Sequence, residues 1–488
     1  MSQPDLSTSR AKNLALALLA MTQFVVVIDA SIVNVALPSI GDALHFSQAD
    51  LSWVVNSYTL TFGGFLLLGG RLADYLGRRR IFMIGIALFA VASLAGGLAQ
   101  TESWLISARA VQGLGAAIAS PAALSIITTT FAEGQDRNRA LGIWGAVAGA
   151  GGAAGVLLGG VLTQWAGWEW VLFVNVPIGA FIFWQAPKRL VESTADEESD
   201  RTLDLPGAVT VSAGLALGVY GMVDATKVGW SSADTIWKLA GAVALLVAFV
   251  VIELRTSKPL VPFSIFRQRT LRGANIVGVL IGMSLFSMFF LITLYLQQVL
   301  GDDALQAGLS YLPLAIAIIL TAGAASALVT RIGFKTVLIV GMLFVAAGLT
   351  WFAQIQPDGS YAVSVLGPSI LAGIGLGASF VPVTIAAVTG TEPHEAGLAS
   401  GLINTAQQVG GALGLAILAT IANSKTVDAF GAGADKATAL TQGFSHAFAV
   451  GAGFAVLGAV LAAVLISSRD SREHSEAARA GEVAVVAA

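Results

Sequence analysis

A run of 24 residues close to the N-terminus, positions 14–37, reads LALALLAMTQFVVVIDASIVNVAL. An α-helix needs about 20 mostly apolar residues to cross the hydrocarbon core of a bilayer, so this run is long enough to span a membrane. Arg10 and Lys12 precede it, as basic residues precede the apolar core of a signal peptide. However, the run is too long for such a core, and no convincing cleavage site follows it. We therefore expect a retained transmembrane helix that carries one carboxylate, Asp29.

The composition of the whole chain favours the same environment. Of the 488 residues, 56% are hydrophobic and 11% are charged, whereas a soluble protein usually carries about 25% charged residues. Lipid is therefore the expected outer solvent. The net charge of −3 provides no basic surface for nucleic acid. The absence of cysteine excludes disulfides and thiolate chemistry, and the four histidines form no metal-binding motif; they are His45, His394, His446 and His474.

Apolar runs predict fourteen spans in all. They lie near 14–38, 52–70, 81–99, 104–130, 140–163, 171–187, 205–224, 236–254, 273–299, 307–330, 336–354, 363–389, 397–421 and 443–467. With the N-terminus placed in the cytoplasm, 21 of the 26 Lys and Arg residues fall on the cytoplasmic side, as the positive-inside rule requires. Four fall outside, and one, Arg109, lies within a span. A helix missed or added midway would destroy this asymmetry, so it supports the predicted topology.

An internal repeat divides the spans into two similar halves. Three glycines of the fifth span recur 259 residues later in the thirteenth span: Gly151, Gly152 and Gly155 correspond to Gly410, Gly411 and Gly414. Chance agreement between Gly-rich helices is the alternative, but two further pairs of similar stretches follow in the same order. Such repeats are typical of transporters, in which two halves rock around a central site.

The predicted fold is thus an all-α membrane protein with 14 transmembrane helices, built as two pseudo-symmetric six-helix bundles with two inserted helices between them. The predicted order is a cytoplasmic N-terminus at 1–13, the N-terminal bundle at 14–187, a cytoplasmic linker at 188–204, the inserted helices at 205–254, a cytoplasmic loop at 255–272, the C-terminal bundle at 273–467 and a cytoplasmic tail at 468–488. The charged tail is expected to be disordered.

The loop between the second and third spans reads GRLADYLGRRR over positions 70–80. A turn this short needs the backbone freedom of Gly77, and Asp74 can pair with a nearby arginine or with a helix N-terminus. The loop resembles the signature of the major facilitator superfamily. This resemblance implies that Gly70, Asp74, Gly77, Arg78 and Arg79 form a conformational latch, whose charge pairs form in one state of the transporter only.

Other stretches resemble the same family. Positions 109–115 read RAVQGLG, like its fourth-helix motif, and 29–38 and 168–179 resemble its fourteen-helix drug:proton antiporter branch. Positions 151–160, GGAAGVLLGG, resemble the fifth-helix motif associated with antiport, which gives a role to Gly151, Gly155, Gly159 and Gly160. Val156 stands where that motif has proline. The missing proline removes a site for an intrinsic kink and leaves the direction of transport open.

Asp29 and Arg109 are ionisable residues deep inside spans, where a charge costs roughly 2.5–3.5 kcal/mol on insertion scales. One interpretation is a structural ion pair. The other is that Asp29 binds and releases a coupled proton while Arg109 tunes its affinity, because desolvation raises the pKa of a carboxylate and a nearby cation lowers it. In the family these two positions are implicated in coupling, so the resemblance favours the second interpretation.

Nine polar and aromatic side chains are predicted to line a substrate cavity between the halves. They are Asn34, Tyr58, Gln112, Trp144, Phe286, Phe290, Asn404, Gln407 and Gln408. The last three share one helical face, and the aromatic members would give an adaptable apolar pocket. Two alternatives remain: polar side chains also join helices by hydrogen bonds, and most aromatic residues in spans face lipid or fill packing.

The expected function is proton-coupled efflux, or antiport, of small amphipathic drugs or antibiotics across the bacterial cytoplasmic (inner) membrane by alternating access. The alternative is export of an endogenous lipid, siderophore or metabolite on the same scaffold. An enzyme would need a nucleophile–base or metal constellation, a channel a pore-lining ring, and an ATP-driven pump a Walker A loop; the sequence has no sign of these. We therefore expect no enzymatic activity and no cofactor. The expected protein is a monomer whose partners are the substrate, protons and the lipid bilayer, and the choice of H⁺ over Na⁺ rests on the resemblance.

Overall fold

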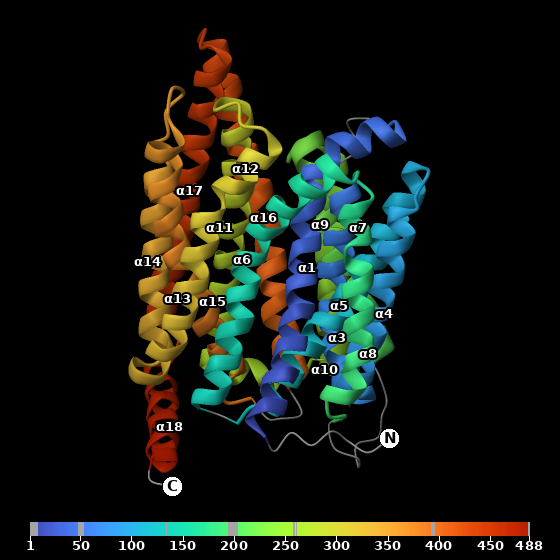
Figure 1. Cartoon of the computed structure of the whole chain (residues 1–488), viewed down its shortest axis with the longest axis vertical. Helices are drawn as coiled ribbons and strands as arrows, with labels where there is room; N and C mark the ends of the chain where they lie inside the picture. The colour runs from blue at the N-terminus through green and yellow to red at the C-terminus, as the bar shows by residue number, and fades with distance from the viewer. Residues whose placement is uncertain are drawn as a thin grey trace.

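The computed structural model describes residues 8–46, 53–132, 134–193, 204–256, 259, 261–391 and 396–486. Their regular structure is helical throughout, and strands are absent from these residues. Long helices lie side by side along one axis of the molecule (Figure 1). Most N-terminal helices, blue to green, occupy one side of this view, and the C-terminal helices, yellow to red, occupy the other. The chain thus forms a helical bundle in which most N-terminal helices lie on one side and the C-terminal helices lie on the other.

The described residues of the first half form seven helices. They are α1 (Ser9–Leu44), α3 (Trp53–Leu76), α4 (Arg78–Gly97), α5 (Glu102–Thr130), α6 (Gln135–Trp165), α7 (Trp170–Phe173) and α8 (Asn175–Arg189). Local signals set their ends: the hydroxyls of Thr8 and Thr101 cap α1 and α5. Gly77, at φ 103°, allows the sharp turn from α3 into α4. Within this half α1 packs on α6, while α5 packs on α3 and α4.

The second half repeats this arrangement. It contains η1 (Phe263–Arg267), α11 (Arg269–Leu294), η2 (Tyr295–Val299), α12 (Ala304–Ser310), α13 (Leu312–Ile332), α14 (Phe334–Phe352), η3 (Tyr361–Leu366), α15 (Gly367–Val388), α16 (Ala396–Gly431) and α17 (Lys436–Leu465). Here α11 packs on α16 as α1 does on α6, and α15 packs on α13 and α14 as α5 does on α3 and α4. Equivalent helices therefore have equivalent neighbours, as an internal repeat requires.

The inserted helices lie at the seam between the halves. They are α9 (Leu205–Val228) and α10 (Ala233–Arg255), which pack on each other, and α9 also contacts α3 and α16. The Trp230 indole donates to Thr420 Oγ1 of α16 over 2.9 Å. The ring of Tyr220 lies 5.1 Å from that of Trp53 in α3. This pair of helices is thus attached to both halves.

Eleven helices of the described residues are long and apolar enough to cross a membrane. They cover all the predicted spans except 52–70, 140–163 and 205–224. These three coincide with α3, α6 and α9, which are helical. The all-helical fold with many membrane-spanning helices is therefore confirmed, and the number fourteen stays a prediction.

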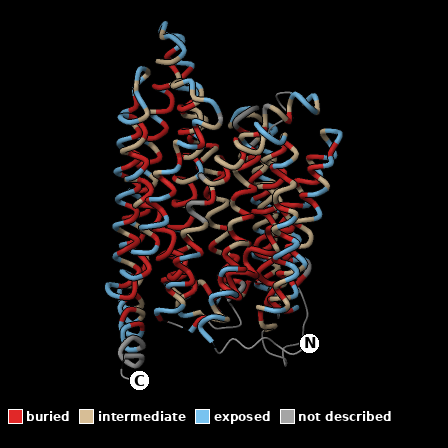
Figure 2. Tube along the Cα trace, viewed as in Figure 1, coloured by how far each residue is buried: buried red, intermediate tan, exposed pale blue. Residues whose placement is uncertain are grey.

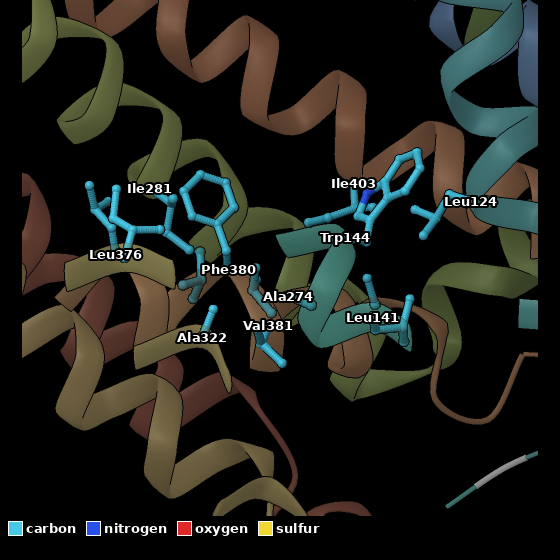
Figure 3. Packing of buried hydrophobic residues seen from close by; sticks show 14 of the residues in the cluster. Leu124, Leu141, Trp144, Ala274, Ile281, Ala322, Leu376, Phe380, Val381 and Ile403 are labelled. Carbon is cyan, nitrogen blue, oxygen red and sulfur yellow. The ribbon is translucent and has the colours of Figure 1, made fainter. Parts of the chain in front are cut away.

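Buried residues concentrate where helices face one another, and exposed residues follow the outer faces of the bundle (Figure 2). One apolar cluster continues from the first half into the second. In it Trp144 and Leu141 of α6 lie close to Ile403 of α16, with Phe380 and Val381 of α15 nearby (Figure 3). The two halves therefore share a packed core.

The C-terminal tail is not disordered as far as the structure describes it. Residues Ser468–Val486 form a helix, α18, which contacts α13, α14 and α6. Small buried residues at Ser471, Ser475 and Ala478 form its packing face. The Ser471 hydroxyl accepts the backbone N–H of Lys335 over 3.1 Å. The expectation was wrong because the charged residues that suggested disorder occupy the outer face of an amphipathic helix.

Candidate functional site

The centre of the first half holds an ion pair that is closed to solvent. Arg109 Nη1 of α5 lies 2.5 Å from Asp29 Oδ2 of α1, and both side chains are 0% exposed. The two residues are 80 positions apart in the sequence, and α1 packs against α5. The structure therefore brings together the two residues that the sequence predicted as a proton-coupling pair.

Two amides hold the second oxygen of the carboxylate. Gln112 Nε2 of α5 and Asn175 Nδ2 of α8 each donate to Asp29 Oδ1 over 2.7 Å. The same two nitrogens donate to Ser93 Oγ of α4, over 3.0 and 3.1 Å. Ser93 in turn donates to the backbone oxygen of Leu172 over 2.8 Å. Asp29 is thus the shared acceptor of a buried polar network from three helices.

Arg109 is fixed from several directions. Its Nη1 also donates to Gln112 Oε1 over 2.7 Å, and its Nε donates to the Val54 backbone oxygen of α3 over 3.0 Å. The guanidinium lies 4.4 Å from the ring centre of Tyr58, in cation–π geometry. Its Nη2 atom is buried and has no hydrogen-bond partner among the described residues. Arg109 is therefore positioned by α3 as well as by its contact with Asp29.

This arrangement determines the chemistry of the site. A buried carboxylate is tolerable when a cation and several donors compensate its charge, and removal of one partner leaves an uncompensated charge. Adding a proton to Asp29 would remove the attraction to Arg109 and require the donors to rearrange. The site can therefore couple a change in protonation to a change in the packing of α1, α5 and α8.

The residues of the predicted latch join the two halves at one end of the bundle. Arg78 Nη2 and Nε lie 3.0 and 3.2 Å from Asp74 Oδ1. Asp74 Oδ2 accepts the backbone N–H of Leu398 over 3.1 Å. Leu398 lies in the first turn of α16, where N–H groups lack intrahelical acceptors and the helix dipole favours a negative charge. Asp74 thus connects α3 to the second half.

The remaining latch residues support this turn. Gly70 is buried in α3, about one turn before Asp74. Arg79 donates to the Leu190 backbone oxygen over 3.1 Å, and its Nε lies 3.5 Å from Glu192. The backbone N–H of Arg79 also donates to Glu192, over 3.0 Å. The segment after α8 is therefore attached to the start of α4.

A second contact between the halves lies at the N-terminal end of α6. Ser326 Oγ of α13 donates to the Asn138 backbone oxygen over 2.8 Å, and Asn138 Nδ2 donates to Thr330 Oγ1 over 3.3 Å. His474 Nε2 of α18 lies 3.0 Å from Asn138 Oδ1. The tail helix therefore adds a third element to this contact.

The glycines of the predicted antiport helix lie against α1. A side chain at Gly151 would meet Val27, one at Gly155 would meet Ser31, and one at Gly159 would meet the backbone oxygen of Ile32. Gly160 is buried beside them. α6 continues as a regular helix through Val156, the position where the motif has proline. These small residues allow α1, which carries Asp29, to approach α6 closely.

Three of the nine predicted cavity residues are buried. Tyr58 and Gln112 belong to the Asp29 network, and Tyr58 also donates to the Val26 backbone oxygen over 3.2 Å. Trp144 lies in the shared apolar core, beside Leu141 and Ile403 (Figure 3). The structure therefore gives these three side chains contacts within the protein, and their contact with a substrate stays a prediction.

The other six are partly or largely exposed. Asn34 and Asn404 donate to backbone oxygens of their own helices. Gln408 lies beside α3, since its Cβ is 3.8 Å from where a side chain at Gly63 would begin. Gln407 faces α11 in the same way, near Gly278. Phe286 and Phe290 are 36% and 40% exposed. Contact of these six residues with a substrate stays a prediction.

One surface groove lies apart from these residues. It runs between α4 and α8 on the first half and is lined mainly by apolar side chains, among them Met83, Leu88, Val91 and Phe183. None of the nine predicted cavity residues lines it. The groove therefore does not bear on the predicted substrate cavity.

Sequence reasoning missed Ser93 and the role of Asn175. Asn175 stands inside the stretch 168–179 that resembles the antiporter branch, but nothing in its spacing connects it to Asp29, which is 146 positions away. Ser93 is one of many small residues in its helix. A buried amide in an apolar span was the one available signal.

The comparisons with known proteins agree with this architecture. A family model of the Major Facilitator Superfamily matches residues 19–415. The chain is 43% identical to the cephamycin export protein CmcT of Amycolatopsis lactamdurans, over 86% of this chain and 87% of that protein. It is 39% identical to the puromycin resistance protein pur8 of Streptomyces alboniger, over 93% and 91%. The crystal structure of the human organic anion transporter MFSD10 (TETRAN) superposes with a TM-score of 0.65 at 13% identity, over 92% of this chain and 99% of that chain, which shows a common fold.

Proposed function

The chain belongs to the Major Facilitator Superfamily, and from that membership we propose that it exports small amphipathic drugs or antibiotics in exchange for protons. The two named relatives, an export protein and a resistance protein, cover nearly the whole chain at about 40% identity. Export of an antibiotic-like compound is therefore the activity that the relatives support best. The membrane is the bacterial cytoplasmic membrane in this proposal, with both termini in the cytoplasm.

The observation that supports proton coupling is the buried Asp29–Arg109 pair. A charged carboxylate in an apolar bundle is costly, yet the chain surrounds this one with three donors from α5 and α8. A carboxylate is also the simplest group that can hold one proton while the site changes its access from one side of the membrane to the other. This geometry and the family resemblance support the proposal of proton antiport through Asp29.

The proposed cycle uses the two halves as rigid bodies. The described structure has its halves joined at the end that holds Asp74 and Asn138, which the charge distribution assigns to the cytoplasm. Asp29 is closed to solvent in the described structure. In the proposed cycle, opening toward the outer side lets Asp29 take up a proton, and Arg109 then loses its counter-charge. The halves then rock, the cytoplasmic contacts open, and a substrate displaces the proton.

A drug-susceptibility panel tests this function. The gene would be expressed in an efflux-deficient host, and resistance to β-lactams, puromycin, dyes and lipophilic cations would be measured with and without a protonophore. Resistance to several compounds that the protonophore abolishes is the expected result. Resistance that persists without a proton gradient would contradict proton coupling.

Export of an endogenous lipid, siderophore or metabolite is the second candidate. It predicts no resistance in the panel and an accumulation of the native compound in cells that lack the gene. The partly buried side chains of Asn404, Gln407 and Gln408 would serve either substrate class. We favour drugs or antibiotics because of the relatives. The proposed unit is a monomer.

A further inference from the structure

Asn175 donates a hydrogen bond to Asp29 but is not part of the ion pair with Arg109. It begins α8 and is 1% exposed. Among the described residues its side-chain hydrogen bonds all leave from Nδ2, one to Asp29 Oδ1 and one to Ser93 Oγ. Both hydrogens of the amide nitrogen are therefore in use, and the amide is aligned by two acceptors.

A protonated Asp29 would need an acceptor for its own O–H. Arg109 cannot provide one, because a guanidinium has donors only. Gln112 is held at both ends, since its Oε1 accepts from Arg109 while its Nε2 donates to Asp29. Turning the Gln112 amide would point two donors at each other. Asn175 has no such restraint from Arg109.

We propose that Asn175 is the positioning residue that adapts to the protonation state of Asp29. Its Nδ2 donates to the carboxylate, and its amide, turned by half a rotation about Cβ–Cγ, accepts the O–H of the carboxylic acid through Oδ1. The Ser93 hydroxyl, which donates to Leu172 in the described state, turns to donate to the same Oδ1. The added proton stays on Asp29. The turn gives up the bonds from Asn175 Nδ2 to Asp29 and Ser93 and the bond from Ser93 to Leu172. This inference rests on the proposed function, in which Asp29 exchanges a proton.

The sign of the effect follows from the strength of the bonds. Hydrogen bonds to an ionised group are roughly twice as strong as neutral ones. Removing the Asn175 amide therefore costs the charged carboxylate more than it costs the acid, and Asp29 should hold its proton to higher pH. Arg109 and Tyr58 are the charged and titratable side chains that interact with Asp29 among the described residues, and both are kept in this variant.

The experiment uses the full-length protein in lipid nanodiscs. Binding of a substrate found in the drug panel is measured as a function of pH by quenching of tryptophan fluorescence, for wild type, Asn175→Ala, Asp29→Asn and Asn275→Ala. Asn275 is the matched control, because its amide donates to the backbone oxygen of Leu271 in its own helix, away from the network. The midpoint for Asn175→Ala is expected about 0.5–1 pH unit above wild type, and Asn275→Ala should overlay wild type.

A spectroscopic readout separates an adapting amide from a fixed donor. The carbonyl band of protonated Asp29, identified by its loss in Asp29→Asn, is recorded by infrared difference spectroscopy between high and low pH. An O–H that donates to an amide lowers the frequency of this band. In Asn175→Ala the band should move to higher frequency, and an unchanged band would overturn the proposed turn of the amide.

The outcomes distinguish the proposed role of Asn175 from the proposed proton coupling through Asp29. If Asp29→Asn removes the pH dependence and Asn175→Ala overlays wild type, the inference is wrong and the proposed function stands. If Asp29→Asn keeps the wild-type pH dependence, proton coupling through Asp29 is wrong. If Asn175→Ala does not fold, Ser93→Ala takes its place, with a smaller shift expected in the same direction. An unchanged midpoint for a folded Ser93→Ala would then overturn the inference.

Discussion

Asp74 Oδ2 and the backbone nitrogen of Leu398 lie 3.1 Å apart, although the residues are 324 positions apart in the chain. This bond joins the end of α3 to the first turn of α16 and so connects the two halves. Arg78 holds the other carboxylate oxygen at the same time. One carboxylate therefore combines an ion pair within its own half with a helix N-terminus of the other.

Replacing Asp74 with Asn should slow transport without changing substrate preference. The change removes the negative charge from the N-terminus of α16, an interaction worth about 0.3–1 kcal/mol or more when partly buried, and it removes the charge that pairs with Arg78. We expect initial efflux rates several-fold below wild type, measured with a fluorescent substrate in everted vesicles. Asp302→Asn, in the loop between η2 and α12, is the control. A changed order of competing substrates would contradict a latch.

Variants of the Asp29–Arg109 pair should separate its contribution to stability from its contribution to transport. Arg109→Ala leaves a buried carboxylate without its cation, which typically costs about 3–5 kcal/mol. The double variant Asp29→Asn, Arg109→Gln removes both charges and should regain most of the thermal stability, measured by scanning fluorimetry in detergent. It should remain inactive in proton-driven transport. A double variant that still pumps would show that the pair is structural only.

The glycine face of α6 should be sensitive to a single methyl group. A Cβ at Gly159 would lie 2.6 Å from the Ile32 backbone oxygen, which cannot move without shifting α1. Gly159→Ala should therefore lower the unfolding temperature by several degrees, because overpacking typically costs about 1–3 kcal/mol. Gly453→Ala in α17 is the matched control, since nothing lies within 4 Å of its Cβ position. Equal unfolding temperatures for the two variants would contradict the close approach of α1 and α6.

The contact between His474 and Asn138 should bias the halves toward the described state. His474→Ala removes the bond from α18 to α6 and leaves the bonds of α13 to Asn138. The chain has no native cysteine, so spin labels at introduced cysteines replacing Arg139 and Ile332, both exposed, report the separation of α6 and α13. We expect a larger fraction of long distances in His474→Ala. Glu476→Ala, on the exposed face of α18, is the control and should match wild type.

The helical membrane fold and the ion pair could both be predicted from the sequence, because charged residues are rare in apolar spans and costly to bury there. Long apolar runs identify the helices, and two isolated charges within them, Asp29 and Arg109, must find each other or another partner. The latch and the glycine face of α6 came from a resemblance, and the structure shows the contacts they make.

The rest could not be predicted from one chain. Asn175 reaches Asp29, and Ser93 reaches Asn175 and Gln112, only because α8 packs on α1 and α4 packs on α5 and α8. No local pattern encodes that packing. The tail helix was missed because its charged residues suggest disorder. Its small residues at 471, 475 and 478 share one helical face and were the available signal.

Substrate movement driven by a pH gradient tests the role of Asp29 most directly. Purified wild type and Asp29→Asn are reconstituted in proteoliposomes, and accumulation of a fluorescent substrate is followed after a pH gradient is imposed and again without one. Wild type should accumulate substrate only with the gradient, and Asp29→Asn should show exchange along the substrate's own gradient but no accumulation. Accumulation by Asp29→Asn at the wild-type rate under the pH gradient would contradict the proposed mechanism.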